Sequence, residues 1–377
     1  MYIEERQYQM SIERAIPAAS TLEHLSPLFP ALEPDVIPVI AGPCSAESRA
    51  QVLETARQIA ATGCVSAFRA GLWKPRTHPG GFEGVGAEGL AWLAEVKAAT
   101  GMPVATEVAT REHVEAAIAA GIDIIWIGAR TSANPFAVQE IADALSTVAN
   151  RVAVLVKNPV NPDIELWIGA LQRIRLAGVR RLAAVHRGFS AYGRHLYRNP
   201  PQWRIPIELK RRYPQLPVYC DPSHIGGERS LVGGVARKAM EIGFDGLIVE
   251  SHCSPECALS DKSQQLTPES LAALLGTLVA RHGGACATDD LTLMRRQIDQ
   301  IDDELLSLLS QRMMVSDKIG TYKREHNMSV VQTTRYTALI NRLGDAAQSL
   351  GLAPDFVAAL FETIHEESVR RQLSPEQ

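Results

Sequence analysis

The sequence predicts an α/β protein: a (β/α)8 TIM barrel followed by a small all-α domain of three helices that dimerises. Eight short apolar segments alternate with helical stretches over residues 36–280. Strands separated by helices pair in parallel, and eight such units in this length match a barrel. From residue 289 the pattern is helical to the end. We therefore expect an N-terminal arm (1–35), the barrel (36–280), a linker (281–288) and the helical domain (289–377).

The expected strands share short length, apolar character and a turn signal after them. In chain order they are Val36–Ala41, Val65–Arg69, Pro103–Glu107, Asp123–Gly128, Val152–Lys157, Arg181–His186, Leu216–Asp221 and Gly246–Ser251. Several helical stretches between them close with Ala-Gly or Ile-Gly, a usual helix end. An open doubly wound sheet is the alternative, and it is disfavoured because GPCSAES, not GxGxxG, follows the first strand.

The tail begins with one unusually long helical pattern. Residues 290–326 contain one Gly and no Pro. Thr288 or Asp289 is suited to the N-cap position of this helix. Apolar side chains recur at threes and fours: Leu291, Met294, Ile298, Ile301, Leu305, Leu308, Val315, Ile319 and Tyr322. A helix this long needs a partner, so we expect a bundle or an intertwined dimer. Two shorter helices follow, near residues 334–347 and 354–372.

Composition excludes several function classes. A formal charge of −4 and a pI near 6.2 give no reason to expect a nucleic-acid or membrane-surface partner. No apolar run reaches the roughly 18 residues of a spanning helix, and the charged start MYIEERQYQM is unlike a signal peptide. Six unevenly spaced Cys do not form a disulfide framework. We expect a cytoplasmic protein with reduced thiols and no membrane.

Titratable side chains follow all eight strand ends, where barrel enzymes carry their chemistry. They are Cys44; Arg69 with Lys74 and Arg76; Glu107; Arg130; Lys157; His186 with Arg187; Asp221 with His224; and Glu250 with His252. Exposed salt bridges are the alternative for any single one. Several cations at one barrel mouth would repel each other, so their convergence predicts phosphate or carboxylate ligands.

A second pattern predicts a metal. Cys44, His224, Glu250 and Asp261 offer sulfur, nitrogen and oxygen from separate loops. Such a mixed set favours a divalent transition metal such as Mn, Fe, Co or Zn. The alternative is that the Cys and His are merely packed. The CxxxC of Cys253 and Cys257 has no second pair nearby and is interpreted as ordinary loop cysteines.

These residues carry a resemblance to a known family. The motifs are AGPCS (41–45), FRAGLWKPRT (68–77), IGAR (127–130), VKNP (156–159), HRG (186–188), DPSH (221–224) and ESH (250–252). They resemble 3-deoxy-D-arabino-heptulosonate-7-phosphate (DAHP) synthase, in the shorter bacterial form (type I-beta) that also embraces 3-deoxy-octulosonate-8-phosphate synthase. The KPRT motif separates the two activities, because the octulosonate enzymes carry an Asn-Arg arrangement there.

The resemblance implies a metal-dependent, aldol-type condensation of phosphoenolpyruvate with erythrose 4-phosphate. It assigns Arg69, Lys74, Arg130, Lys157 and Arg187 to phosphoenolpyruvate, and Arg76 and Thr77 to the erythrose phosphate. Pro75, also of the KPRT motif, is counted among the substrate-binding residues of the barrel. Cys44, His224, Glu250 and Asp261 match the metal ligands, with Mn2+ expected first and Fe2+, Co2+ or Zn2+ as alternatives. Lys74 would protonate the nascent alkoxide or organise the attacking water.

The helical tail has its own cations. Arg312 and Lys323 lie eleven residues apart and share a helix face, whereas Arg295 lies about 100° away round the helix. Arg335 opens the second helix, and Ser368 and Gln372 form an i, i+4 pair on the third. A solvated coiled-coil surface is the alternative reading of these charges. Residues 289–372 resemble the all-helical (type II) chorismate mutases, whose long helices entwine as a dimer.

That resemblance implies rearrangement of chorismate to prephenate without a cofactor. Arg295 matches the arginine that enters the partner's site, and Arg295, Arg312 and Arg335 suit the two carboxylates. Lys323 and Gln372 suit the ether oxygen, and Ser368 completes the polar set. Tyr336 and Gln332 stand where relatives carry Glu and Asp. Together the resemblances predict a bifunctional enzyme whose barrel is restrained by prephenate or chorismate at the helical domain. The alternatives are a non-catalytic binding and dimerisation tail, or octulosonate-phosphate synthesis in the barrel.

Overall fold

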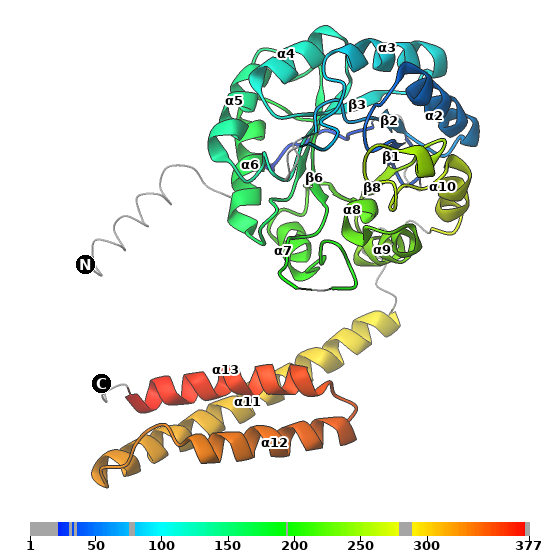
Figure 1. The fold of residues 1–377 in the computed structure, drawn as a ribbon. Coiled ribbons are helices and arrows are strands. Elements are labelled where there is room, and N and C mark those ends of the chain that lie inside the picture. The colour runs from blue at the N-terminus through cyan, green and yellow to red at the C-terminus, as the bar shows by residue number, and fades with distance from the viewer. Residues whose placement is uncertain are drawn as a thin grey trace. The chain divides into compact units, whose positions relative to one another are not determined.

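The computed structural model of the chain describes residues 22–29, 32–33, 36–74, 80–193, 195–278 and 289–373. The chain separates into two compact units, residues 1–283 and residues 284–377. The first unit is a barrel ringed by helices, and the second consists of three helices (Figure 1).

Eight parallel strands close the barrel in chain order. They are β1 (Val39–Gly42), β2 (Ala67–Arg69), β3 (Val104–Val108), β4 (Ile124–Ile127), β5 (Ala153–Lys157), β6 (Leu182–His186), β7 (Val218–Cys220) and β8 (Gly246–Glu250). Strand β1 pairs with β8 so that Gly42 lies opposite Glu250. The barrel prediction is confirmed, and the open doubly wound sheet is excluded.

Helices surround this barrel (Figure 1). They are α2 (Arg49–Thr62), α3 (Glu88–Thr100), α4 (Arg111–Ala119), α5 (Pro135–Leu145), α6 (Ile164–Leu176), α7 (Arg204–Arg212), α8 (Pro222–Gly226), α9 (Arg229–Ile242) and α10 (Pro268–Leu275), with a short 3-10 turn η2 (Pro255–Cys257). Local caps fix several of their starts, since the Ser48 side chain accepts from Gln51 N–H and Asp163 accepts from Leu166 N–H. Gly63 ends α2 in a left-handed conformation, as the terminal glycine predicts.

Each strand sends alternate side chains to opposite faces. The outward set forms a large core with the helices, including Phe68, Ile125 and Val154. The inward set fills the barrel with mostly small or branched residues around Trp126. The barrel interior is therefore a packed core, and polar chemistry is confined to its ends.

Part of the N-terminal arm is described. Leu22 and Leu28 are buried, and Ser26 N–H donates to the Arg180 carbonyl at 2.9 Å. The arm is therefore attached to the barrel over this stretch. Residues 1–21 and the predicted linker, 281–288, lie outside the described residues.

The second unit contains α11 (Asp289–Glu325), α12 (Thr333–Ser349) and α13 (Pro354–Leu373). Helix α13 packs against both α11 and α12. The three predicted helices are confirmed. Helix α11 leaves a long apolar face exposed, which carries Met294, Ile298, Ile301, Leu305, Leu308, Val315, Ile319 and Tyr322. Within the described ranges, no helix combines the length and apolar character that crossing a bilayer requires.

Candidate active site

The inward face of the barrel ends in charged side chains at the carboxyl ends of the strands. On β5, Ala153 and Leu155 point inward, so alternation places Lys157 at the mouth; on β8, Ile248 is followed in the same way by Glu250. On β2, β3, β6 and β7 the same alternation continues from the inward-pointing residues to one charged side chain at or just after the end of each strand. These side chains are Arg69, Glu107, Arg187 and Asp221. The convergence predicted from the strand ends follows from this register.

Arg69 forms the floor of the mouth. Its side chain is completely buried, and its guanidinium carbon lies 4.6 Å from the centre of the Trp126 ring. Nη2 donates to the Cys44 carbonyl at 3.2 Å and lies 3.4 Å from Glu250 Oε1. Among the described residues, Arg69 Nε and Nη1 have no hydrogen-bond partner. A buried guanidinium with two donors unused is suited to an anionic ligand.

Lys157 lies near the same ring, with its Nζ 5.8 Å from the centre of the Trp126 ring. It also pairs with Asp221, whose Oδ2 is 2.7 Å away, and both side chains are buried. Asp221 Oδ2 lies 2.8 Å from His224 Nδ1 as well. Burial acts to raise the pKa of Asp221, but His224 and Lys157 hold that pKa well below its usual range. Asp221 therefore stays ionised, and it joins the predicted substrate cation to a predicted metal ligand.

Cys44, Glu250 and Asp261 bring three possible ligand atoms within 4.8 Å of one another. Cys44 Sγ is 3.3 Å from Asp261 Oδ2. His224 is outside this close set but adjacent to it, with Nε2 3.7 Å from Glu250 Oε1. The predicted ligands thus meet at one place, three of them tightly and the fourth beside them.

The electrostatics of this cluster fit a divalent cation. Burial, with Glu250 adding to it, raises the pKa of the Cys44 thiol to about 12. Burial acts to raise the pKa of Asp261 too, but His224 and Arg198 hold it below its usual range. A buried thiol beside two ionised carboxylates is costly unless a positive charge neutralises them, and sulfur, nitrogen and oxygen donors together suit a transition metal.

Lys74 lies at the edge of the same cluster. Its Nζ is 4.0 Å from Glu107 Oε2, and it packs over Gly71, where an added Cβ would be 2.8 Å from Nζ. Gly128 similarly makes room for the Glu107 carboxylate, since a Cβ there would be 2.1 Å from Oε1. Burial opposes the charge on Lys74, but Cys44 and Glu107 raise its pKa above the usual value. Lys74 is therefore a protonated donor beside the candidate metal ligands.

Arg187 and Arg130 are the remaining predicted cations of the mouth that the structure describes. Arg187 is buried, and burial lowers its pKa to about 10, with Arg198 and Arg130 close enough to add to the effect. Arg130 itself is exposed. Arg76 and Thr77, predicted to hold the second phosphate, and Pro75, predicted to bind substrate, lie outside the described residues.

The expectation that His186 belongs to this mouth is wrong. It precedes Arg187 on β6 and therefore faces the helices, among the rings of Trp167, Phe189, Trp203 and Phe244. Burial lowers its pKa to about 3, so it is a neutral core residue. Side chains alternate between the two faces of a strand, and this alternation alone would have assigned His186 and Arg187 to opposite faces.

Three residues of the mouth were not predicted. Arg198 Nη1 donates to Asp261 Oδ1 and to Gln264 Oε1, both at 2.9 Å. Gln264 and Gln265 are fully buried beside the ligand cluster. Neither glutamine is titratable, and Arg198 lies in a loop between β6 and α7, so strand-end reasoning gave no signal for them.

The helical unit has a second polar cluster, between α11 and α13. Arg312 Nη1 donates to Ser368 Oγ at 2.5 Å, and Gln372 Nε2 donates to Ser316 Oγ at 2.9 Å. Gln372 Oε1 has no partner among the described residues. Lys323 is buried and donates to the Val330 carbonyl at 2.7 Å. Arg312 and Ser316 of the first helix therefore meet Ser368 and Gln372 of the third, whereas the hydrogen bond of Lys323 goes to the loop after α11.

Arg295 and Arg335 are not drawn into this cluster. Both side chains are exposed, and Arg295 lies seventeen residues before Arg312 on the same helix, about 25 Å along its axis. Arg295 therefore cannot serve the same site as Arg312 within one chain. Tyr336, on α12, packs on His365 of α13 with ring centres 4.5 Å apart.

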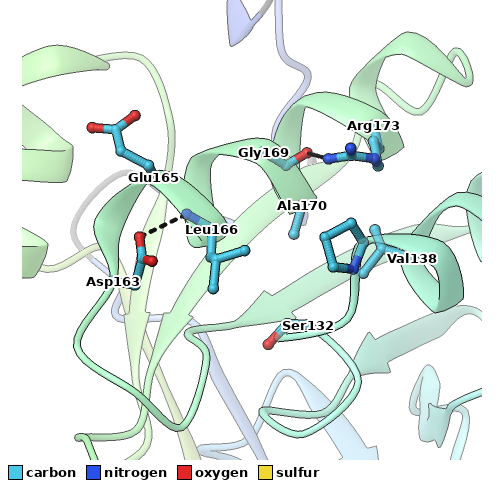
Figure 2. Close-up of a pocket in the computed structure, with 9 residues that line it drawn as sticks. Ser132, Val138, Asp163, Glu165, Leu166, Gly169, Ala170 and Arg173 are labelled. Carbon is cyan, nitrogen blue, oxygen red and sulfur yellow. Dashed lines mark hydrogen bonds between the residues drawn. The ribbon is translucent and has the colours of Figure 1, made fainter.

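A separate cavity of about 310 Å³ lies on the outside of the barrel between α5 and α6 (Figure 2). Its charged residues are already engaged locally, since Asp163 caps α6 and Arg173 donates to the Gly169 carbonyl at 3.2 Å. The residues predicted for catalysis do not line it, and we assign it no role in the reaction.

Comparison with known proteins agrees with this division. The family model described as "DAHP synthetase I family" matches residues 34–281, and "Chorismate mutase type II" matches residues 294–373. A Thermotoga maritima protein named phospho-2-dehydro-3-deoxyheptonate aldolase is 36% identical over 228 residues. That match covers 60% of this chain and 64% of the relative. A Nitratidesulfovibrio vulgaris 2-dehydro-3-deoxyphosphooctonate aldolase is 31% identical over 257 residues, covering 64% of this chain and 90% of that protein.

Solved structures give the same picture of the barrel. The crystal structure of the Thermotoga maritima phospho-2-dehydro-3-deoxyheptonate aldolase matches with a TM-score of 0.57 and 33% identity, covering 64% of this chain and 67% of that one. A truncated form of the Thermotoga maritima 3-deoxy-D-arabino-heptulosonate 7-phosphate synthase gives 0.55 and 32%, covering 64% and 84%. The chain belongs to the DAHP synthetase I family, and it carries after its barrel a helical domain of the chorismate mutase type II family.

Proposed function

We propose that the barrel is a DAHP synthase, 3-deoxy-7-phosphoheptulonate synthase, which condenses phosphoenolpyruvate with erythrose 4-phosphate and releases phosphate. The observation that carries the proposal is the buried Arg69 guanidinium, whose Nε and Nη1 lack a partner among the described residues. Lys157 and Arg187 are buried near the same mouth. Three buried cations are stable together with a ligand that has both a carboxylate and a phosphate.

In this proposal Arg69, Lys74, Arg130, Lys157 and Arg187 hold phosphoenolpyruvate. Arg76 and Thr77 hold the phosphate of erythrose 4-phosphate, and Pro75 between them and Lys74 is part of the same substrate-binding segment. C3 of phosphoenolpyruvate attacks the aldehyde carbon, water adds at C2, and phosphate leaves. Lys74 is protonated because Cys44 and Glu107 raise its pKa despite its burial, so its ammonium can donate the proton that the new alkoxide needs.

Cys44, His224, Glu250 and Asp261 would hold a divalent metal ion, Mn2+ first and Fe2+, Co2+ or Zn2+ as alternatives. When bound, such an ion supplies a Lewis acid for the aldehyde oxygen. The chain's own contribution is to keep the carboxylates of Glu250 and Asp261 ionised and to orient the ligands. Asp221 contributes by its contact with His224 Nδ1, which leaves Nε2 facing Glu250.

We further propose that the helical domain converts chorismate to prephenate. Arg312 and Arg335 bind the carboxylates, with Arg295 of the partner subunit, and this fixes the folded conformer. Lys323 and Gln372 stabilise the negative charge on the ether oxygen, and Ser368 orients Arg312 through their 2.5 Å hydrogen bond. A pericyclic rearrangement requires no nucleophile, base or cofactor.

Dimerisation through α11 supports the same proposal. The exposed apolar residues of α11 run from Met294 to Tyr322. Covering that face with a second α11 would remove apolar surface from water and carry Arg295 to the partner's cluster. We propose that prephenate or chorismate bound there restrains the barrel, which would explain a fusion of two steps that are not consecutive.

The alternatives are an octulosonate-phosphate synthase barrel and a helical domain that only binds and dimerises. Substrate choice tests the first. Full-length protein is given phosphoenolpyruvate with erythrose 4-phosphate or with arabinose 5-phosphate, and we expect phosphate release only with the former. Formation of prephenate from chorismate by the same preparation tests the second. Release of phosphate with arabinose 5-phosphate but not with erythrose 4-phosphate would contradict the barrel assignment. Absence of prephenate would mean that the helical domain only binds and dimerises.

A further inference from the structure

Two adjacent glutamines, Gln264 and Gln265, hold together the segments that carry the candidate metal ligands. Both side chains are fully buried. They follow Asp261 closely and precede Leu266, whose N–H donates to the Glu250 carbonyl at 3.0 Å. We propose that this pair positions Cys44, Glu250 and Asp261 for the metal before it binds, an inference that rests on the proposed metal site.

Gln264 orients one carboxylate directly. Its Nε2 donates to Glu250 Oε2 at 2.6 Å. The other oxygen of Glu250 faces Arg69 Nη2 at 3.4 Å and His224 Nε2 at 3.7 Å. Because Oε2 is held by an amide and Oε1 by weaker contacts, the amide fixes the rotation of the carboxylate and directs Oε1 toward the other ligands.

Gln264 also connects Glu250 to Asp261. Its Oε1 accepts from Arg198 Nη1 at 2.9 Å, and the same nitrogen donates to Asp261 Oδ1 at 2.9 Å. That leaves Asp261 Oδ2 facing Cys44 Sγ at 3.3 Å. One amide and one guanidinium thereby hold two carboxylates so that one oxygen of each faces the thiol side of the cluster.

Gln265 fastens the third ligand. Its Oε1 accepts from the Cys44 N–H at 3.0 Å, and its Nε2 donates to the Ser260 carbonyl at 2.8 Å. The Ser45 and Ser260 hydroxyls lie 2.5 Å apart and make a second link between the same two segments. The segment after β1 is therefore tied to the residue before Asp261 by two buried connections.

The backbone at Asp261 explains why this support is needed. Its φ is +45°, in the left-handed region that few side chains adopt. The turn is closed by Gln264 N–H donating to the Asp261 carbonyl at 3.2 Å. A ligand in a sparsely populated conformation keeps its position only when the surrounding bonds over-determine it.

The test is metal binding by the full-length apo protein, with Co2+ as the probe. Co2+ bound to the Cys44 thiolate gives a sulfur-to-metal charge-transfer band, which reports ligand geometry independently of turnover. Gln264→Met and Gln265→Met keep the side-chain length and remove the hydrogen bonds. Since outer-shell groups typically contribute 10–100-fold to metal affinity, we expect each to raise the Co2+ dissociation constant by about that factor and to weaken the band.

Two further variants separate positioning from general destabilisation. Ile141→Val removes one methylene from the buried face of α5, away from the cluster, and should bind Co2+ within about twofold of the original protein while losing comparable stability. Gln265→Asn keeps the amide but is one methylene too short to span Cys44 N–H and the Ser260 carbonyl, and it should weaken binding like Gln265→Met with less disturbance of the fold.

The outcomes are distinguishable. Loss of affinity and band in the glutamine variants, with Ile141→Val unaffected, supports the proposal. Binding and band unchanged in the glutamine variants, or reduced only as far as in Ile141→Val, overturns it and leaves the metal site intact. Failure of the original protein to bind Co2+ through Cys44 overturns the metal assignment and this inference with it, while phosphate release with erythrose 4-phosphate is judged separately.

Discussion

Lys157 Nζ lies 2.7 Å from Asp221 Oδ2, and both side chains are buried at the barrel mouth. The net contribution of a buried ion pair to the free energy of unfolding is often small, but removal of one partner is strongly destabilising. Removal leaves the other charge without compensation, and here it also removes a proposed ligand of phosphoenolpyruvate. The pair therefore links the stability of the barrel to substrate binding.

Substitution Lys157→Met should lower the free energy of unfolding by about 3–5 kcal/mol, because Asp221 stays buried and loses one of its cations. The KM for phosphoenolpyruvate should rise as well. Urea unfolding and initial rates measure the two effects. Lys97→Met is the matched control, since Lys97 pairs with Asp123 at 2.7 Å with its side chain 44% exposed. Its effect should stay below about 1 kcal/mol, and an equal effect of the two variants would contradict the argument.

Substitution Cys44→Ala should abolish metal-dependent turnover, because it removes the sulfur ligand from the cluster with Glu250 and Asp261. Metal content after dialysis and rate of phosphate release measure the effect together. Cys253→Ala is the control, since Cys253 is a half-buried loop cysteine that no predicted ligand contacts among the described residues. A Cys44→Ala protein that keeps its metal and its rate would remove Cys44 from the ligand set.

His186 makes the stability of the barrel sensitive to acid. Burial lowers its pKa to about 3, whereas an unfolded His has a pKa of about 6.5. Between these values the unfolded chain binds a proton that the folded chain does not, so stability falls as the pH falls below 6.5. The loss should amount to about 2 kcal/mol by pH 5.

Comparison with His186→Leu isolates this contribution. The difference in unfolding free energy between the two proteins should shrink by about that amount from pH 7 to pH 5, because Leu does not titrate. Urea unfolding at several pH values measures it. Ile125→Val is the control, because Ile125 is buried in the core and does not titrate, so the difference between this variant and the original protein should stay flat with pH. A flat difference for His186→Leu as well would mean that His186 is solvated.

The sequence was sufficient for the barrel because the eight apolar segments and the helix-ending glycines are local signals. It also located Arg69, Lys157 and Glu250, because strand ends of a parallel barrel meet at one mouth. It failed where contacts are long-range: Cys44 and Gln265 are 221 residues apart in sequence, and their hydrogen bond leaves no local pattern. The prediction for His186 was wrong for a different reason. Neighbouring residues along a strand point to opposite faces, so His186 faces the helices while Arg187 faces the barrel mouth.

A shared site in the helical domain predicts complementation. Arg295→Ala and Arg312→Ala should each lower prephenate formation by about 10²–10³-fold, since each removes a group that holds or stabilises the reacting substrate. In a mixed dimer one site carries both substitutions and the other neither, so unfolding and refolding an equimolar mixture should restore about a quarter of the original rate.

The control for complementation is Arg296→Ala, on an exposed neighbour of Arg295. It should leave prephenate formation within about twofold, because its side chain belongs to neither proposed site. Each variant refolded alone should remain inactive. A mixture that stays as inactive as its components would mean that Arg295 and Arg312 do not form one site across a dimer.

The most direct test of the account is consumption of phosphoenolpyruvate by the full-length protein with erythrose 4-phosphate. It is measured after EDTA treatment, after restoration with Mn2+, and with and without prephenate. We expect loss of turnover with EDTA, recovery with Mn2+ and inhibition by prephenate. Recovery without inhibition would keep the enzyme and remove the proposed regulation. Absence of turnover with Mn2+, Fe2+, Co2+ and Zn2+ would mean that the barrel is not a DAHP synthase.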